Sequence, residues 1–138
     1  MKITTLIARI LFAMIFLLAG SSLFSAAAIS YASYQGVPLA KLLVPLSGVL
    51  SITGALSIIL GYKTRIGALL IVLFLIPVSF AMHPFWNVAD PSMRQIQLSM
   101  FMKNISMLGA ALFFFGEGSG AYSLDSRKIT RIRAAETA

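Results

Sequence analysis

Apolar residues fill four long stretches of this chain, and each stretch is long enough to cross a membrane as a helix. The stretches cover residues 4–30, 39–61, 66–83 and 96–116. A helix rises ~1.5 Å per residue and the hydrocarbon core of a bilayer is ~30 Å thick, so about 20 apolar residues span it. The pattern therefore predicts an all-α fold, a four-helix transmembrane bundle.

Turn and cap residues separate the stretches. Residues 31–38 contain a glycine and a proline and are predicted to form a loop, and residues 61–65 form a tight basic connection. Asp90 followed by Pro91 is typical of a helix start, so the fourth helix is expected to begin near residue 91. Glycines at 116, 118 and 120 end it, which predicts a membrane domain at 1–120 and a basic tail at 121–138.

Two features modify the second and third helices. Pro45 either kinks the second helix or marks a later start, and Pro77 is expected to bend the third. Ser47, Ser51 and Gly54 form a small-residue stripe with Ile58 on the second helix. Small residues let membrane helices approach closely, so the stripe predicts tight packing.

The first stretch has a competing interpretation as a cleaved signal peptide. Lys2 resembles the charged start of a signal, and residues 25–28 offer small side chains for cleavage. The stretch is longer than the apolar region of a signal, which favours a membrane helix.

Composition excludes several classes of function. The chain has 138 residues, of which 59% are hydrophobic and 11% charged, which is too apolar for a soluble domain of this size. The absence of cysteine excludes disulfides, iron–sulfur clusters and thiolate zinc sites, and a single histidine cannot supply bis-histidine haem ligation or a conventional zinc site. No nucleotide-binding motif or catalytic constellation is present, so no cofactor, metal site or catalytic residue is predicted.

Basic residues give the chain a net charge of +7. They adjoin apolar segments, so the expected partner is anionic lipid headgroups and not nucleic acid. The candidate headgroup-binding residues are Lys63, Arg65, Arg127, Lys128, Arg131 and Arg133. The tail is either a surface helix capped by Asp125 or Ser126, or a disordered segment. The positive-inside rule predicts that both termini lie in the cytoplasm.

Polar side chains inside the apolar stretches are candidates for a function. Lys103 and Asn104 lie within the fourth stretch, where a charge costs several kcal/mol unless it is paired or reaches the interface. Depth along the predicted helices gives a candidate pocket in the outer half of the membrane, made of Lys103, Asn104, His83, Ser79, Ser47 and Ser22. The alternatives are that Lys103 extends its amine to the headgroups and that His83 is a hydrogen-bonding residue of the interface.

Short motifs in this order resemble those of the DoxX-like family of small bacterial membrane proteins. They are Ala8-Arg9-Ile10-Leu11, Phe16-Leu17-Leu18-Ala19-Gly20, Gly36-Val37-Pro38, Gly61-Tyr62-Lys63-Thr64-Arg65, His83-Pro84-Phe85-Trp86, Phe101-Met102-Lys103-Asn104, the glycines at 116, 118 and 120, and Ser123-Leu124-Asp125. The chain departs from the family pattern at Leu23, where a lysine is usual, and at Ser51, where a glutamate is usual. The resemblance implies an inner-membrane protein, in some relatives a subunit of a quinone-linked oxidoreductase or of a redox-stress complex.

Two functional hypotheses follow. The first is a non-catalytic accessory subunit of a redox-linked, quinone-related membrane complex, with a membrane or redox protein or a second copy of the chain as partner. The second is a binding or transport protein for a small amphipathic molecule such as a quinone or a lipid.

Overall fold

A computed structural model describes residues 2–127 and confirms the predicted four-helix membrane fold. Its elements are α1 (Lys2–Ser22), α2 (Ala26–Tyr34), α3 (Ala40–Leu60), α4 (Thr64–Met82), a 3-10 turn η1 (Phe85–Asn87) and α5 (Pro91–Glu117). No strand occurs within the described range. Four segments are long and apolar enough to span a membrane, namely Ile3–Ser22, Ala40–Leu60, Thr64–Asn87 and Pro91–Glu117.

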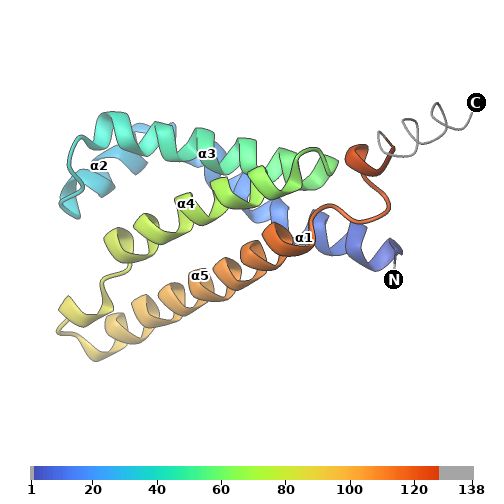
Figure 1. Cartoon of the computed structure of the whole chain (residues 1–138). Helices are drawn as coiled ribbons and strands as arrows, with labels where there is room; N and C mark the ends of the chain where they lie inside the picture. The colour runs from blue at the N-terminus through green and yellow to red at the C-terminus, as the bar shows by residue number, and fades with distance from the viewer. Residues whose placement is uncertain (1, 128–138) are drawn as a thin grey trace, which may run out of the picture.

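The long helices pack in a chain of neighbours. Helix α1 packs on α3, α3 on α4 and α4 on α5, while α2 lies on α3. The N-terminus, the turn between α3 and α4, and the segment after α5 lie together at one end of the molecule, which we call the terminal end (Figure 1). Helix α2 and the turn η1 lie at the opposite end.

The prediction of one continuous helix over 4–30 followed by a loop over 31–38 is wrong. Helix α1 ends at Ser22, and a separate helix α2 runs to Tyr34. The physical cause is Ser25, which has extended backbone angles and whose hydroxyl accepts a hydrogen bond from the backbone N–H of Ala28 at 3.2 Å. A serine in this conformation is a helix N-cap, so it stops one helix and starts the next.

The other helix boundaries agree with the sequence pattern. Helices α3, α4 and α5 start and end within two residues of the predicted limits 39–61, 66–83 and 91–116. Asp90 caps α5 as predicted, because its Oδ1 accepts a hydrogen bond from the N–H of Met93 at 2.7 Å. Helix α3 already begins at Ala40, so Pro45 lies inside it and does not mark a later start.

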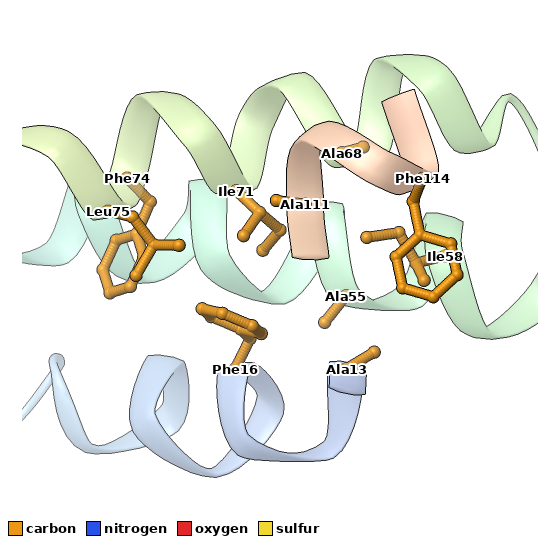
Figure 2. Close-up of a cluster of buried hydrophobic side chains, with 10 residues drawn as sticks. All are labelled: Ala13, Phe16, Ala55, Ile58, Ala68, Ile71, Phe74, Leu75, Ala111 and Phe114. Atoms are coloured by element: carbon orange, nitrogen blue, oxygen red, sulfur yellow. The ribbon is translucent and has the colours of Figure 1, made fainter. Parts of the chain in front are cut away.

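The core is built from small and aromatic side chains on the four long helices. Figure 2 shows Phe16 of α1 facing Phe74 and Leu75 of α4, and the two phenylalanine rings meet edge to face with centroids 6.1 Å apart. Phe114 of α5 closes the core towards the terminal end, where its ring lies 5.3 Å from that of Phe12. These contacts make α1 part of the core.

Glycines allow the helices to cross closely. A Cβ atom added to Gly48 of α3 would lie 2.9 Å from the carbonyl oxygen of Gly20 on α1. The predicted small-residue stripe of α3 is confirmed as a packing face, since Ser51, Gly54 and Ile58 are buried. The hydroxyl of Ser51 also donates to the carbonyl of Phe16 at 2.8 Å, which joins α3 to α1.

Candidate functional site

The three serines of the predicted pocket are hydrogen-bonded within their own helices. Each hydroxyl donates to a carbonyl three or four positions earlier, at 2.8 Å for Ser22, 2.7 Å for Ser47 and 2.6 Å for Ser79. Ser22 is exposed, Ser47 is half-buried and Ser79 is buried. A serine satisfied in this way needs no ligand.

The other three predicted pocket residues lie near the η1 end of α4 and along α5. Lys103 is exposed and its amine contacts the sulfur of Met100 at 3.3 Å, which is a weak acceptor. Asn104 is buried, and Nδ1 of His83 lies 2.8 Å from Oε1 of Gln97. Neither of the two cavities described below is lined by these residues, so their joint role in binding a ligand stays a prediction.

An apolar cavity of about 340 Å³ lies among α2, α3 and α4, away from the terminal end. Aliphatic and aromatic side chains line it, and the polar side chains in its lining are those of Tyr31 and Ser47. Its volume falls in the range of small-molecule sites, ~300–1,000 Å³. The hydroxyl of Tyr31 accepts a hydrogen bond from Gln35 at 3.1 Å and keeps its own proton available as a donor.

The apolar cavity opens towards the membrane. Leu46 and Leu73 belong to its lining and are 48% and 52% exposed, so they form a rim on the lipid-facing surface. The sequence pattern did not reveal this site, because its lining consists of ordinary apolar residues. Only Ser47 belongs both to this lining and to the pocket predicted from the sequence.

Arg9 holds the terminal end together. This side chain is 1% exposed, and its guanidinium donates to the carbonyls of Ser119, Ile59 at 3.2 Å and Tyr122 at 2.8 Å. The carboxylate of Asp125 is close enough to interact with it electrostatically. Sequence reasoning missed this role, although a charged residue within an apolar stretch is the same signal that drew attention to Lys103.

A polar groove of about 490 Å³ lies beside this network, between the start of α4 and the end of α5. Residues 63–66, 117–120 and 125–126 line it. Oδ1 of Asp125 accepts a hydrogen bond from the backbone N–H of Lys63 at 3.1 Å. Nη2 of Arg65 donates to the carbonyl of Gly116 at 3.1 Å. The predicted role of Lys63 and Arg65 in binding headgroups stays a prediction.

The segment after α5 forms a short helical turn over residues 124–127. The prediction that Asp125 or Ser126 caps it is wrong, since the hydroxyl of Ser123 accepts the hydrogen bond from the N–H of Ser126 at 3.1 Å. Arg127 is exposed, while Lys128, Arg131 and Arg133 lie outside the described residues. Within residues 2–127 no group of three or more His, Cys, Asp or Glu side chains is placed to hold a metal ion.

Four apolar spanning helices, an apolar cavity open to the membrane and a polar groove at the ends of two spans define a small integral membrane protein. The family model of the SURF4 family matches residues 4–130. The chain belongs to the SURF4 family.

Two bacterial relatives are similar over most of their length. Inner membrane protein YphA of Escherichia coli (strain K12) is 30% identical over 124 residues, which cover 88% of each chain. Inner membrane protein YqjF of the same organism is 34% identical over 122 residues, which cover 87% of this chain and 88% of YqjF. Both relatives are inner membrane proteins. With its four spanning helices, the present chain is likewise an integral inner-membrane protein.

A eukaryotic relative matches over a shorter region. The Surfeit locus protein 4 homolog of Schizosaccharomyces pombe (strain 972 / ATCC 24843) is 30% identical over 81 residues, which cover 58% of this chain and 27% of that protein. No solved structure matches the chain.

The resemblance to the DoxX-like family is corrected by these comparisons. The match over residues 4–130 is to the SURF4 family, whereas the earlier assignment rested on motifs of three to five residues. The link to a redox complex was an implication of that resemblance, so it loses its support.

Proposed function

We propose that the protein is a non-catalytic membrane protein that binds a small amphipathic molecule, such as a quinone or a lipid, in the apolar cavity. The observation that supports this proposal is the cavity itself, about 340 Å³ of space among α2, α3 and α4 with an apolar lining. An apolar occupant of this hollow would supply the contacts that the lining side chains lack while it is empty.

The lining favours a ligand with a long apolar part and one weakly polar end. Leu23, Phe74 and Met82 are among the apolar residues that would surround the apolar part. Tyr31 belongs to the lining, and its hydroxyl would donate a hydrogen bond to the polar end. Because Leu46 and Leu73 lie at the membrane surface, the ligand would enter sideways from the lipid phase.

The same lining opposes catalysis in this cavity. None of the described residues that line it carries a carboxylate, imidazole or ammonium group, so the hydroxyls of Tyr31 and Ser47 have no charged acid or base beside them in the lining. Binding, with or without release to a partner, is the activity that such a lining supports.

Native mass spectrometry of the protein released from lipid nanodiscs tests the proposal. We expect one adduct that survives activation energies at which bulk lipid dissociates. Ala28 lines the cavity and the adjacent Ala27 of the same helix is exposed, which gives a matched pair of variants. Ala28→Phe fills the cavity and is expected to remove the adduct, whereas Ala27→Phe is expected to retain it. Equal adducts in both variants would show that ordinary lipid covers the surface and would overturn the proposal.

A further inference from the structure

The polar groove at the terminal end lies at the depth of lipid headgroups. One membrane span begins at Thr64 and another ends at Glu117, and both residues line the groove. We propose that this groove binds a phosphate diester that carries a primary ammonium group, the chemistry of an ethanolamine phospholipid headgroup. This site is separate from the apolar cavity and does not depend on the function proposed for it.

The phosphate is held on the side of α4. Lys63 and Arg65 supply two positive charges there, next to the N-terminus of a helix of 19 residues. A helix N-terminus adds partial positive charge and free N–H groups, which favour a bound phosphate. Arg65 uses Nη2 for the carbonyl of Gly116, and its other N–H groups remain as donors.

Thr64, a residue of the groove lining, has a buried hydroxyl without a partner in the described part of the chain. Thr64 lines the groove and is 1% exposed, and its Oγ1 has no hydrogen-bond partner among residues 2–127. Buried polar atoms in folded proteins nearly always have a partner, so an unpaired one calls for a missing ligand or water. A phosphate oxygen at the start of α4 would accept the hydrogen bond from this hydroxyl.

The charge balance of the groove selects a zwitterion. Two basic residues, Lys63 and Arg65, and two acidic residues, Glu117 and Asp125, line the groove, and the buried cation of Arg9 already interacts with Asp125. Asp125 already accepts the hydrogen bond from the N–H of Lys63. Glu117 is exposed, and its carboxylate makes no hydrogen bond or ion pair within the part of the chain that the structure describes. A headgroup with an ammonium group pairs with this carboxylate, whereas a purely anionic headgroup would be repelled by it.

Titration of the delipidated protein with short-chain phospholipids, followed by native mass spectrometry, tests the proposal. We expect phosphatidylethanolamine to bind roughly tenfold more tightly than phosphatidylcholine, because a quaternary ammonium cannot donate a hydrogen bond to Glu117. Phosphatidylglycerol, which lacks the ammonium, is also expected to bind more weakly. Equal binding of the three lipids would overturn the proposal.

Three variants assign the preference to the groove. Glu117→Gln is expected to remove the preference for ethanolamine over choline. Arg65→Gln is expected to lower the affinity for all three lipids. Arg94→Gln, at an exposed position on α5 near the opposite end, is expected to change neither the preference nor the affinity. Thr64→Val is expected to weaken lipid binding without lowering the stability of the lipid-free protein. An unchanged ethanolamine preference in Glu117→Gln would refute the site. If Arg65→Gln fails to fold, Arg65→Lys keeps the charge and must keep the preference.

Two further measurements separate this site from the apolar cavity and identify the source of the headgroup. Ala28→Phe, which fills the apolar cavity, is expected to leave the ethanolamine preference intact, and its loss in that variant would overturn the assignment to the groove. Glycerophosphoethanolamine has the same headgroup chemistry without acyl chains. If this compound binds as tightly as the lipid, the ligand is a soluble molecule. If it binds more weakly, the ligand is a membrane lipid. Both results support the ethanolamine chemistry, and binding no tighter than that of inorganic phosphate contradicts it.

Discussion

The guanidinium of Arg9 donates a hydrogen bond to the carbonyl of Tyr122 at 2.8 Å, although 113 positions separate the two residues in the chain. The same side chain also donates to the carbonyl of Ile59 next to the turn between α3 and α4. One buried cation thus ties the first helix, the central turn and the segment after the last helix to one another. This network sets the position of the polar groove, since Ser119 and Asp125 belong to both.

Replacing Arg9 by methionine is expected to destabilise the protein by about 3 kcal/mol, because three carbonyls in partly buried hydrogen bonds lose a charged donor. Arg9→Lys is expected to recover only part of the loss, since an ammonium does not reproduce the planar fork of a guanidinium. Unfolding in mixed micelles measures the effect, and the exposed Arg94→Met is the matched control. Equal stability of Arg9→Met and Arg94→Met would contradict the assignment.

Gly67→Ala is expected to destabilise the protein by about 1–3 kcal/mol through overpacking. A Cβ atom at this position would lie 2.9 Å from the carbonyl oxygen of Gly54 and 2.4 Å from the hydroxyl of Ser57, so α3 and α4 would have to separate. Gly109 of α5 is the control, because a Cβ atom there meets nothing within 4 Å. The midpoint temperature of thermal unfolding in detergent should fall for Gly67→Ala and stay level or rise for Gly109→Ala. A lower midpoint for Gly109→Ala than for Gly67→Ala would show that α3 and α4 can separate at this contact without loss of stability.

The sequence predicts most of the fold because membrane helices depend on long apolar runs that are visible in one dimension. It did not predict α2, since residues 26–30 continue the apolar run of α1 and only Ser25 marks the break. A serine inside an apolar run is ambiguous. It caps a helix here, whereas Ser79 bonds to its own helix and interrupts nothing.

The candidate sites were harder to predict for two physical reasons. The partners of Arg9 are backbone carbonyls, which every residue carries and no side-chain pattern reveals. The apolar cavity depends on how well α2 fills the space beside α3 and α4, and its lining has the composition of any core. The residues of the predicted pocket were chosen by their depth in the membrane. Ser22 has a similar predicted depth to the other five but does not line the apolar cavity.

Replacing Arg127, Lys128, Arg131 and Arg133 together by glutamine is expected to release the tail from anionic membranes without unfolding the helices. Each basic residue near the surface contributes about 1 kcal/mol of attraction to anionic lipid. A spin label at the C-terminus measures tail mobility in nanodiscs of neutral and of anionic lipid. If the unmodified chain shows equal tail mobility in both, the predicted headgroup role of these four residues is refuted.

Labelling of single cysteines tests the predicted orientation with both termini in the cytoplasm. The chain has no cysteine, so residues 34, 63, 89 and 130 can each be replaced without a background signal. Residue 63 lies at the terminal end, and residues 34 and 89 lie near α2 and η1 at the other end. A membrane-impermeant thiol reagent is expected to reach 63 and 130 from the cytoplasmic side only. Labelling of residues 34 and 89 from the cytoplasmic side would show that the orientation is the reverse of the predicted one.

Lys103→Met is expected to leave folding and function intact and to keep stability level or raise it. The lysine is exposed on α5, and the contact of its amine in the described structure is the sulfur of Met100, which is a poor acceptor for a cation. Its long stem allows the ammonium to reach the headgroups, so methionine keeps the apolar part and removes a charge from the membrane. The exposed neighbour Met102 provides the reciprocal control, since Met102→Lys places the same charge about 100° away around the helix. Unfolding in detergent and complementation of a deletion strain measure the two effects. A folded Lys103→Met protein that fails to complement would show that the ammonium binds a ligand or a partner within the membrane.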